Sequence, residues 1–182
     1  LLQAKGQTYS VVEFLRNPRW AEAFDGGDFI TYYLCPTDYH RVHSPADADL
    51  VASVHVPGEM WPVNEWSVEN VVDLFNVNER VVMLLQTPRG KIALVMVAAT
   101  NVGNMSFSFD ENIMNNVKDS ERQVREHSYQ PGISIKRGEE LGVFHMGSTV
   151  IVLFEKGILS QDVALLRGQQ VKVRSTLEVT GA

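Results

Sequence analysis

The sequence predicts an antiparallel β-sandwich, or a barrel-like sandwich, with a few short helices. Two apolar stretches, 80–87 and 91–99, flank Pro88-Arg89-Gly90, a pattern typical of a β-hairpin at the centre of a sheet. A third run, Thr149–Phe154, is apolar and β-branched throughout and has the length of one buried strand. Glycine or proline turns separate many other short stretches of strand-like composition, which favours a mainly β fold.

Before the hairpin, the sequence predicts one short helix and two strands. Ser10 and Glu13 have the spacing of a capping box, so we expect a helix to begin there and to end at Asn17-Pro18. Residues 29–34 follow a glycine turn and are rich in aromatic and β-branched side chains, as strands are. Residues 50–56 alternate in part and predict another strand, closed by a proline–glycine turn.

The remaining predicted elements flank a long polar stretch. Apolar residues at helical spacing predict a short amphipathic helix over 67–75. Residues 109–131 combine acidic, basic and amide side chains with little periodicity, so we expect a surface excursion. Gly138 and Gly142 divide the chain that follows. Short strands are expected at 133–136, 143–146, 149–154, 171–174 and 177–179.

Composition predicts a single domain with a sizeable core. The 182 residues are 45% hydrophobic, as in ordinary soluble domains. The net charge of −6 excludes a non-specific nucleic-acid binder, although a local basic patch still permits contact with an anionic membrane. Cys35 is the only cysteine, so we expect no internal disulfide, a reducing compartment and a buried thiol. The longest apolar run, 92–99, is shorter than the roughly 18 residues that a membrane span requires.

The stretch around Ser148 holds the candidate chemistry of the chain. Residues 142–155 read Gly-Val-Phe-His-Met-Gly-Ser-Thr-Val-Ile-Val-Leu-Phe-Glu, so Gly147 and Ser148 immediately precede a predicted strand. Because glycine has no Cβ, the Gly147 carbonyl is open to attack by the hydroxyl of Ser148. The alternative for an isolated Gly-Ser pair is a tight turn before a core strand.

Four blocks, in the same order along the chain, resemble the phosphatidylserine decarboxylases, a family of pyruvoyl-dependent enzymes. One block surrounds Ser148, where the family usually has Leu-Gly-Ser-Thr and this chain has Met-Gly-Ser-Thr. The other three are Tyr-Leu-Cys-Pro-Thr-Asp-Tyr-His-Arg-Val-His at 33–43, Leu-Phe-Asn-Val-Asn-Glu-Arg-Val-Val at 74–82 and Val-Ala-Ala-Thr-Asn-Val-Gly at 97–103. The resemblance covers nearly the whole chain except residues 104–132, and it implies a mainly β core of barrel-sandwich type.

The resemblance implies a carboxy-lyase that converts phosphatidylserine to phosphatidylethanolamine after cutting its own chain. Ser148 would attack the Gly147 carbonyl, the chain would break between them, and Ser148 would become a pyruvoyl group that forms a Schiff base with the substrate. The products would be 1–147, the β subunit, and 148–182, the α subunit. Because the sequence begins without methionine, we expect 1–182 to be one catalytic domain truncated at its N-terminus.

The resemblance also assigns roles to two histidines. His43 matches the base of the self-cleavage triad, and His40 matches the acid or base of the decarboxylation step. The triad aspartate lies in a family segment upstream of residue 1, and Asp47 is not assigned to this role. Read alone, His-x-x-His is half a metal site, but the sequence offers no convincing further ligands, so no metal is expected. We expect the remaining histidines to be partly exposed structural residues, with His145 closest to an accessory role: His55, His127 and His145.

An amphiphilic substrate requires an apolar entrance at a membrane surface. Trp61 and Trp66 suit that interface, and the alternative is that both fill the core. The resemblance implies a homodimer of cleaved protomers attached peripherally to a membrane, and we expect the cytoplasmic side of a bacterial cell membrane rather than the mitochondrial inner membrane. The basic side chains that are either phosphate ligands or solvated surface are Lys136, Arg137, Arg122 and Arg125.

Two other functions fit the same residues. One is a non-catalytic relative that binds a lipid or a partner and never cuts itself, because the absence of the triad aspartate from this sequence permits it. The other is an ordinary serine hydrolase with Ser148 as its nucleophile, but the sequence lacks the Gly-x-Ser-x-Gly pattern of that class. A pyruvoyl-dependent decarboxylase is the leading hypothesis.

Overall fold

Antiparallel strands dominate the fold, which confirms the predicted class. The computed structural model describes residues 2–4, 7–63, 65–100, 104–113, 122–145, 149–159 and 168–175. The strands are β1 (Leu2–Ala4), β2 (Gln7–Tyr9), β3 (Asp28–Tyr33), β4 (Arg41–His43), β5 (Ala48–Val56), β6 (Arg80–Thr87), β7 (Gly90–Val97), β8 (Met105–Phe107), β9 (Arg125–Ile135), β10 (Glu140–Phe144) and β11 (Thr149–Phe154). The α-helices are α1 (Val11–Leu15), α2 (Pro18–Ala21), α3 (Glu65–Asn70) and α4 (Leu74–Val77), and a 3₁₀ turn spans Glu22–Phe24.

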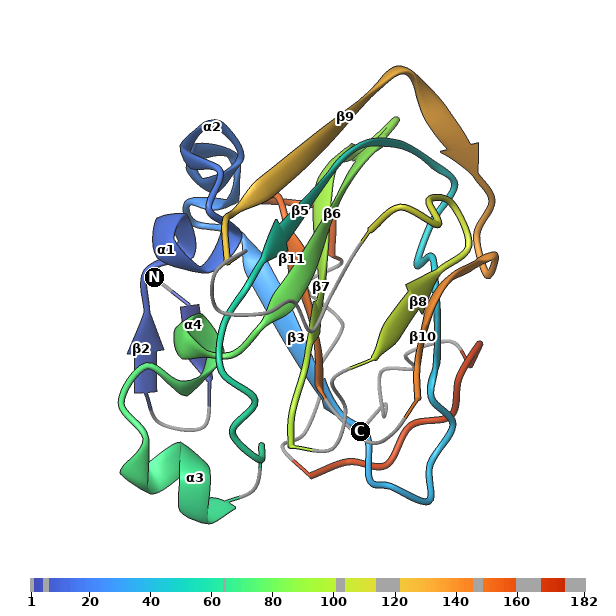
Figure 1. Ribbon diagram of the computed structural model, residues 1–182. Helices are drawn as coiled ribbons and strands as arrows, with labels where there is room; N and C mark the ends of the chain where they lie inside the picture. Colours follow the sequence, from blue (N-terminus) through green and yellow to red (C-terminus); the bar gives the residue numbers. More distant parts are fainter. Residues whose placement is uncertain are drawn as a thin grey trace, which may run out of the picture.

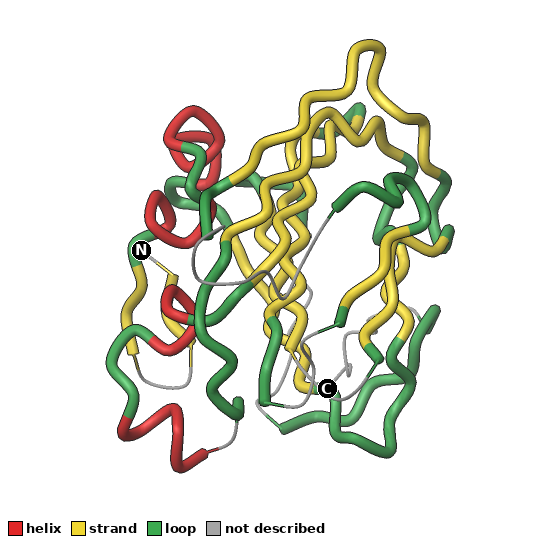
Figure 2. The backbone as a smooth tube through the Cα atoms, in the orientation of Figure 1, coloured by secondary structure: helices red, strands yellow, loops and turns green. Residues whose placement is uncertain are grey.

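Two sheets form a sandwich. The larger has the order β3-β11-β7-β6-β5-β9, and the smaller has the order β4-β10-β8. Figure 1 shows the smaller sheet to the right of the larger one, and the short helices lie on the opposite side. Figure 2 shows the same division, with the red helical turns at the left of the yellow strands. β1 and β2 pair separately in a two-stranded sheet.

The predicted hairpin and the strand that follows Ser148 form the centre of the larger sheet. β6 and β7 pair from Arg80 opposite Val97 to Thr87 opposite Gly90. All residues of β11 are buried, and β11 pairs without interruption with β3 on one side and β7 on the other. Because burying one large aliphatic side chain contributes about 1.5–3 kcal/mol, this strand is bound firmly into the core.

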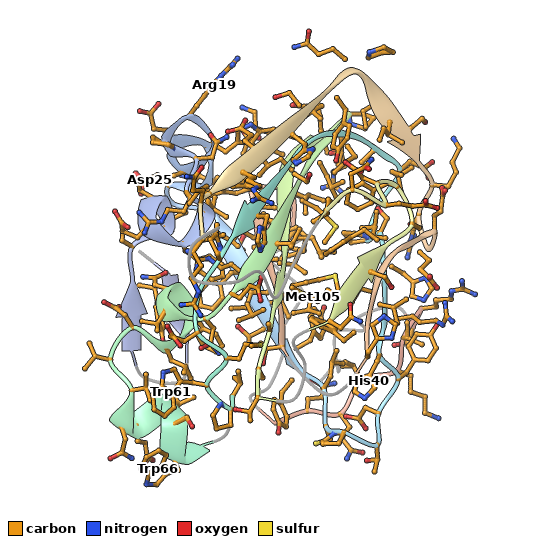
Figure 3. All side chains as sticks on the ribbon, viewed as in Figure 1. Arg19, Asp25, His40, Trp61, Trp66 and Met105 are labelled. Atoms are coloured by element: carbon orange, nitrogen blue, oxygen red, sulfur yellow. The ribbon has the colours of Figure 1, made fainter. Side chains whose placement is uncertain are left out.

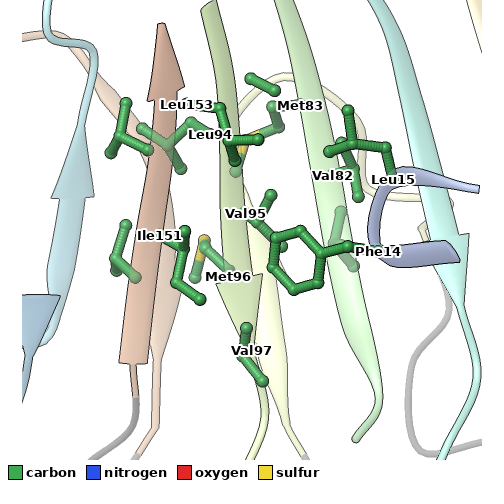
Figure 4. Packing of buried hydrophobic residues seen from close by; sticks show 14 of the residues in the cluster. Phe14, Leu15, Val82, Met83, Leu94, Val95, Met96, Val97, Ile151 and Leu153 are labelled. Atoms are coloured by element: carbon green, nitrogen blue, oxygen red, sulfur yellow. The ribbon is translucent and has the colours of Figure 1, made fainter. Parts of the chain in front are cut away.

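Apolar contacts cover both faces of the larger sheet. On one face, Phe14 and Leu15 of α1 lie beside Val82 and Val95, as Figure 4 shows. On the other face, the smaller sheet approaches closely, because a Cβ atom on the glycine at position 142 would lie 3.0 Å from the Met96 sulfur. This glycine therefore lies within β10, where it lets the two sheets meet, and the prediction that it interrupts a strand is wrong.

Arg80 is a fully buried cation that holds the first helices against the sheet. Its guanidinium donates hydrogen bonds to four backbone carbonyls at 2.7–3.0 Å. Burial lowers the pKa of Arg80 to about 9, so the side chain remains charged at neutral pH. The four acceptors belong to Glu13, Phe14, Asn76 and Asn78.

The predicted N-terminal helix is confirmed and is followed by one that was not predicted. The Ser10 hydroxyl accepts the Glu13 N–H at 3.4 Å, so α1 begins at the expected cap. The side chain of Asn17 then accepts the Trp20 N–H at 3.0 Å, and Pro18 occupies the first turn of α2. The Asn-Pro pair therefore ends one helix and begins another, as the fixed φ of proline permits.

The single helix predicted over 67–75 is wrong. The chain forms α3 and α4 instead, and Asp73 between them has a φ of 55°, which is left-handed. Val72, one of the residues that suggested helical periodicity, is 80% exposed. The apolar residues in this stretch therefore do not share one buried helical face.

Three other predictions near the C-terminal half need correction. The stretch 109–131 is not wholly irregular, because β9 begins at Arg125 and pairs with β5. β10 begins before the predicted strand 143–146 and ends at Phe144. Residues 171–174 form no strand, and 177–179 lie outside the described residues.

A hydrogen-bonded chain of side chains joins β5, β9 and the loop after β8. The Ser53 hydroxyl lies 2.9 Å from the Tyr129 hydroxyl, which donates to the Asp110 carboxylate at 3.0 Å. Burial raises the pKa of Tyr129 to about 12, so it remains a donor at neutral pH. The chain fixes the loop that borders the smaller sheet.

Candidate active site

In sequence, the predicted cleavage site falls between the last strand of the smaller sheet and the last strand of the larger sheet. Gly147 and Ser148, with Met146, fall outside the described residues, so their roles remain predictions. Phe144 ends β10 in the smaller sheet, and Thr149 begins β11 in the larger sheet. The connection from Phe144 to Thr149 therefore leads from one sheet to the other.

Two neighbouring connections lead between the same sheets. β3 is followed by β4, and β7 is followed by β8. In the larger sheet β11 lies between β3 and β7, and in the smaller sheet β10 lies between β4 and β8. Thr149 pairs with Tyr33 and Val97, and Phe144 pairs with Met105. Figure 1 shows β3, β11 and β7 reaching the same lower edge of the larger sheet. The blocks at 33–43 and 97–103 begin at this edge, next to the strand that follows Ser148.

The third block, 74–82, reaches the same region through Glu79. The Glu79 carbonyl accepts the Ala98 N–H at 2.8 Å. The Glu79 carboxylate lies 2.7 Å from Nε2 of His55, and both side chains are buried. His55 is only 2% exposed, so the prediction of a partly exposed histidine is wrong there. Sequence reasoning missed this pair because His55 lies on β5 and Glu79 lies just before β6, 24 residues further along the chain.

His40 lies beside the connection that leads to Thr149. The Phe144 N–H donates to the His40 carbonyl at 3.0 Å. The ring Nε2 of His40 lies 3.1 Å from the Pro36 carbonyl oxygen, and Nδ1 is buried with no partner in the described part of the chain. Figure 3 shows His40 near the lower end of β10. Of the two histidines in the block 33–43, His40 is the closer to Thr149 by strand register.

His43 lies further along β4 and has both ring nitrogens engaged. It pairs with Glu140, four residues before Phe144, and four residues of strand span about 13 Å. Its Nδ1 donates to the Gly138 carbonyl at 2.9 Å, and the Tyr39 hydroxyl lies 2.8 Å from its Nε2. The Gly138 carbonyl thus makes, among the described residues, the orienting contact that the resemblance assigns to an upstream aspartate.

A cavity of about 380 Å³ lies along β8, close to the strand end that leads to Gly147. The Asn104 carbonyl accepts the His145 N–H at 3.2 Å, and the Ser106 hydroxyl lies 3.2 Å from the His145 ring. His145 is exposed, in agreement with the prediction. The side chains that line the cavity are Asn104, Met105, Ser106, Phe107, Asp110, Glu111 and Ile113.

Asp110 supplies a negative charge to this cavity. Burial raises its pKa, but hydrogen bonds from Asn112 and Tyr129 outweigh burial, so the pKa lies below its usual value. His127 lies 3.6 Å from the Asp110 carboxylate and is partly exposed, as predicted. Asp110 is therefore ionised at neutral pH.

The other polar candidates have structural contacts. The Asp47 carboxylate accepts the Arg137 backbone N–H at 2.7 Å, and Arg122 pairs with Glu59 at 2.8 Å. Within the described ranges, no three histidine, cysteine or acidic side chains are grouped as a metal site requires. Cys35 is exposed, so the prediction of a buried thiol is wrong.

An exposed apolar surface lies around α3. Trp61 is 44% exposed and Trp66 is 62% exposed, so the alternative that both fill the core is wrong. The buried Asn78 side chain accepts the Trp61 N–H at 3.0 Å and donates to the Trp61 carbonyl at 2.8 Å. Figure 3 shows both tryptophans at the lower left, at the periphery of the molecule. Among the helices that are described, none is long and apolar enough to cross a membrane.

Comparisons with known proteins agree with the four blocks. A family model described as phosphatidylserine decarboxylase matches residues 1–178. The phosphatidylserine decarboxylase proenzyme of Anaeromyxobacter sp. (strain K) is 43% identical over 97% of this chain and 62% of its own length. That of Myxococcus xanthus is 40% identical over 98% and 62%, and that of Hahella chejuensis is 42% identical over 87% and 53%. The chain thus spans about three fifths of the length of these relatives, or less.

Proposed function

Because the chain belongs to the phosphatidylserine decarboxylase family, we propose that it acts as a pyruvoyl-dependent phosphatidylserine decarboxylase. The observation that carries the proposal is the match over residues 1–178, which includes all four blocks. The fold supports it, since β11 of one block lies between β3 and β7, the strands at whose ends two other blocks begin. The reaction releases CO₂ from the serine head group and leaves phosphatidylethanolamine.

We propose that the active form arises by self-cleavage between Gly147 and Ser148. The serine hydroxyl attacks the preceding carbonyl, its proton passes through a base to the amide nitrogen, and an ester replaces the amide. His43 is the base assigned by the family resemblance. The products are 1–147 and 148–182, and the catalytic domain comprises both.

We propose that the residue left by Ser148 is the pyruvoyl group. When present, this group supplies an electrophilic carbonyl that takes up the electron pair released with CO₂. The described surroundings suit a polar group, because two buried polar atoms near the connection have no partner in the described part of the chain. They are Nδ1 of His40 and the hydroxyl oxygen of Thr149. His40 is the proton carrier for the decarboxylation step.

The direct test is an intact mass spectrum of the purified, denatured protein. We expect two chains that divide between Gly147 and Ser148, with the smaller lighter by one ammonia than the same fragment beginning with serine. Decarboxylation of phosphatidylserine vesicles by the same sample completes the test. A single uncleaved chain without activity would contradict the proposal and would favour the non-catalytic relative.

We propose further that the protein is a peripheral membrane enzyme at the cytoplasmic side of a bacterial cell membrane, and that cleaved protomers form a homodimer. The supporting observation is the exposed pair Trp61 and Trp66, because tryptophan combines an apolar body with a polar N–H and suits the membrane interface. The two hydrogen bonds from the Asn78 side chain fix the backbone of Trp61, and its ring remains exposed to solvent.

Replacing Trp66 by serine is expected to weaken binding to vesicles of phosphatidylcholine and phosphatidylserine roughly tenfold, since burial of one large apolar side chain contributes about 1.5–3 kcal/mol. Vesicle co-sedimentation measures the change. Val124→Ser is the matched control, because Val124 is an exposed apolar residue on another part of the chain. An equal effect of the two substitutions would remove Trp66 from the membrane contact.

A further inference from the structure

The imidazole of His40 is fixed in one tautomer by its contact with Pro36. A carbonyl oxygen only accepts hydrogen bonds, so the 3.1 Å contact requires that Nε2 carry the proton. In the neutral ring, Nδ1 is then the nitrogen with a free lone pair. Nδ1 is also the buried atom that has no partner among the described residues.

An unpaired buried acceptor costs free energy, and proteins rarely keep one without a reason. His43 shows the contrast, because its Nδ1 donates to Gly138 and its Nε2 lies against the Tyr39 hydroxyl. In the segment that carries both histidines, His40 thus has a ring nitrogen that no described residue contacts by a hydrogen bond, whereas both ring nitrogens of His43 have partners. The Phe144 N–H donates a hydrogen bond to the His40 carbonyl, so His40 lies next to the connection that leads to Ser148.

We infer that Nδ1 is the nitrogen through which His40 exchanges a proton with the phospholipid head group, and that the Pro36 carbonyl is the positioning group that reserves Nδ1 for this task. The inference rests on the proposed function and adds to it the reacting atom. It also assigns a role to a backbone group that the sequence blocks do not single out.

One unprotonated ring nitrogen is enough to carry out both proton transfers of the reaction. The head-group ammonium must lose one proton before its nitrogen has a lone pair with which to react, and Nδ1 accepts that proton. When the bond between the α-carbon and the carboxylate breaks, CO₂ leaves and the electron pair remains with the organic fragment. The proton on Nδ1 then forms the new C–H bond, and Nδ1 is neutral again. Through both transfers, Nε2–H keeps its bond to Pro36.

A tight turn holds the Pro36 carbonyl in place. The Asp38 N–H donates to the Cys35 carbonyl at 2.8 Å, and the Cys35 N–H donates to the Asp38 carboxylate at 2.8 Å. Proline also fixes its own φ, so the direction of the carbonyl depends on few free torsions. The turn therefore holds the Pro36 carbonyl that contacts the ring, and the Phe144 N–H holds the backbone carbonyl of His40.

Methylated histidines at position 40 distinguish the two nitrogens. Nδ1-methylhistidine blocks the inferred reacting atom, so we expect a roughly hundredfold or larger fall in kcat, as for loss of general acid–base catalysis. Nε2-methylhistidine breaks the Pro36 hydrogen bond but leaves Nδ1 free, so we expect kcat within about tenfold of the unmodified enzyme. The isomers have equal size, and each is the steric control for the other. An equal loss in both, or a larger loss with the Nε2 isomer, would overturn the inference.

A readout that does not depend on activity is the tautomer itself. In the protein labelled with ¹⁵N-histidine, the His40 signals, assigned with a His40→Gln variant, should show a protonated Nε2 and a bare Nδ1. A protonated Nδ1 in the neutral ring would contradict the inference. If mass spectrometry shows no pyruvoyl chain, the proposed function fails. If the pyruvoyl chain forms and the Nδ1-methyl variant turns over normally, only the inference fails.

Discussion

Ser148→Ala is expected to give a single uncleaved chain with no decarboxylase activity. Alanine has no hydroxyl to attack the Gly147 carbonyl, and it cannot become a pyruvoyl group, so both maturation and turnover are lost. Denaturing electrophoresis and intact mass report cleavage, and CO₂ release from phosphatidylserine vesicles reports activity. Full activity in this variant would refute the pyruvoyl mechanism.

A hydroxyl elsewhere on the surface supplies the control for this substitution. Ser128 is exposed on β9, and Ser128→Ala should cleave and turn over normally. Histidine variants separate the two stages of the reaction. His43→Ala is expected to block cleavage, whereas His40→Ala should impair turnover in protein that has already been cleaved.

Replacing Arg80 by methionine is expected to lower the free energy of unfolding by about 3–5 kcal/mol, because several buried carbonyls lose their hydrogen-bond donor at once. Methionine fills similar space but donates no hydrogen bond to the carbonyls of α1 and the chain around α4. Urea unfolding in the uncleaved Ser148→Ala background measures the change, because one chain then unfolds in one step.

Arg89→Met is the matched control for charge and size. Arg89 is exposed in the turn between β6 and β7, so its replacement should change stability by less than about 0.5 kcal/mol. A loss of less than about 1 kcal/mol for Arg80→Met would mean that the four contacts are weak or that water replaces them.

The elements with both faces buried could be predicted from the sequence. β6, β7 and β11 are long apolar runs, and such runs in short stretches between turns have few alternatives to a central strand. β9 was missed because its partly buried residues Arg125, His127 and Tyr129 are polar or charged and alternate with exposed residues that are also polar. Its pairing with β5 determines this strand, and no apolar periodicity marks it.

Some predictions failed because local propensity was not supported by pairing. Val171 and Val173 favour a strand, but both are exposed and the chain there pairs with no sheet. In the candidate site, the sequence motifs identify His40 and His43, but not the atoms that each ring offers. The partner of His43 at Gly138 lies 95 residues away, and no local pattern reveals such a contact.

The position of β11 between β3 and β7 has a consequence for how the proposed cleaved form holds together. Before cleavage, β11 folds as part of one chain, and its docking between β3 and β7 does not depend on protein concentration. After a cut between Gly147 and Ser148, the same docking is an association of two molecules and obeys mass action. The melting temperature of the cleaved enzyme should therefore rise with concentration. At low concentration, cleaved protein that has unfolded should refold slowly or not at all, because its two fragments must first meet. The cleaved form therefore depends on the fold that the precursor reached before the cut.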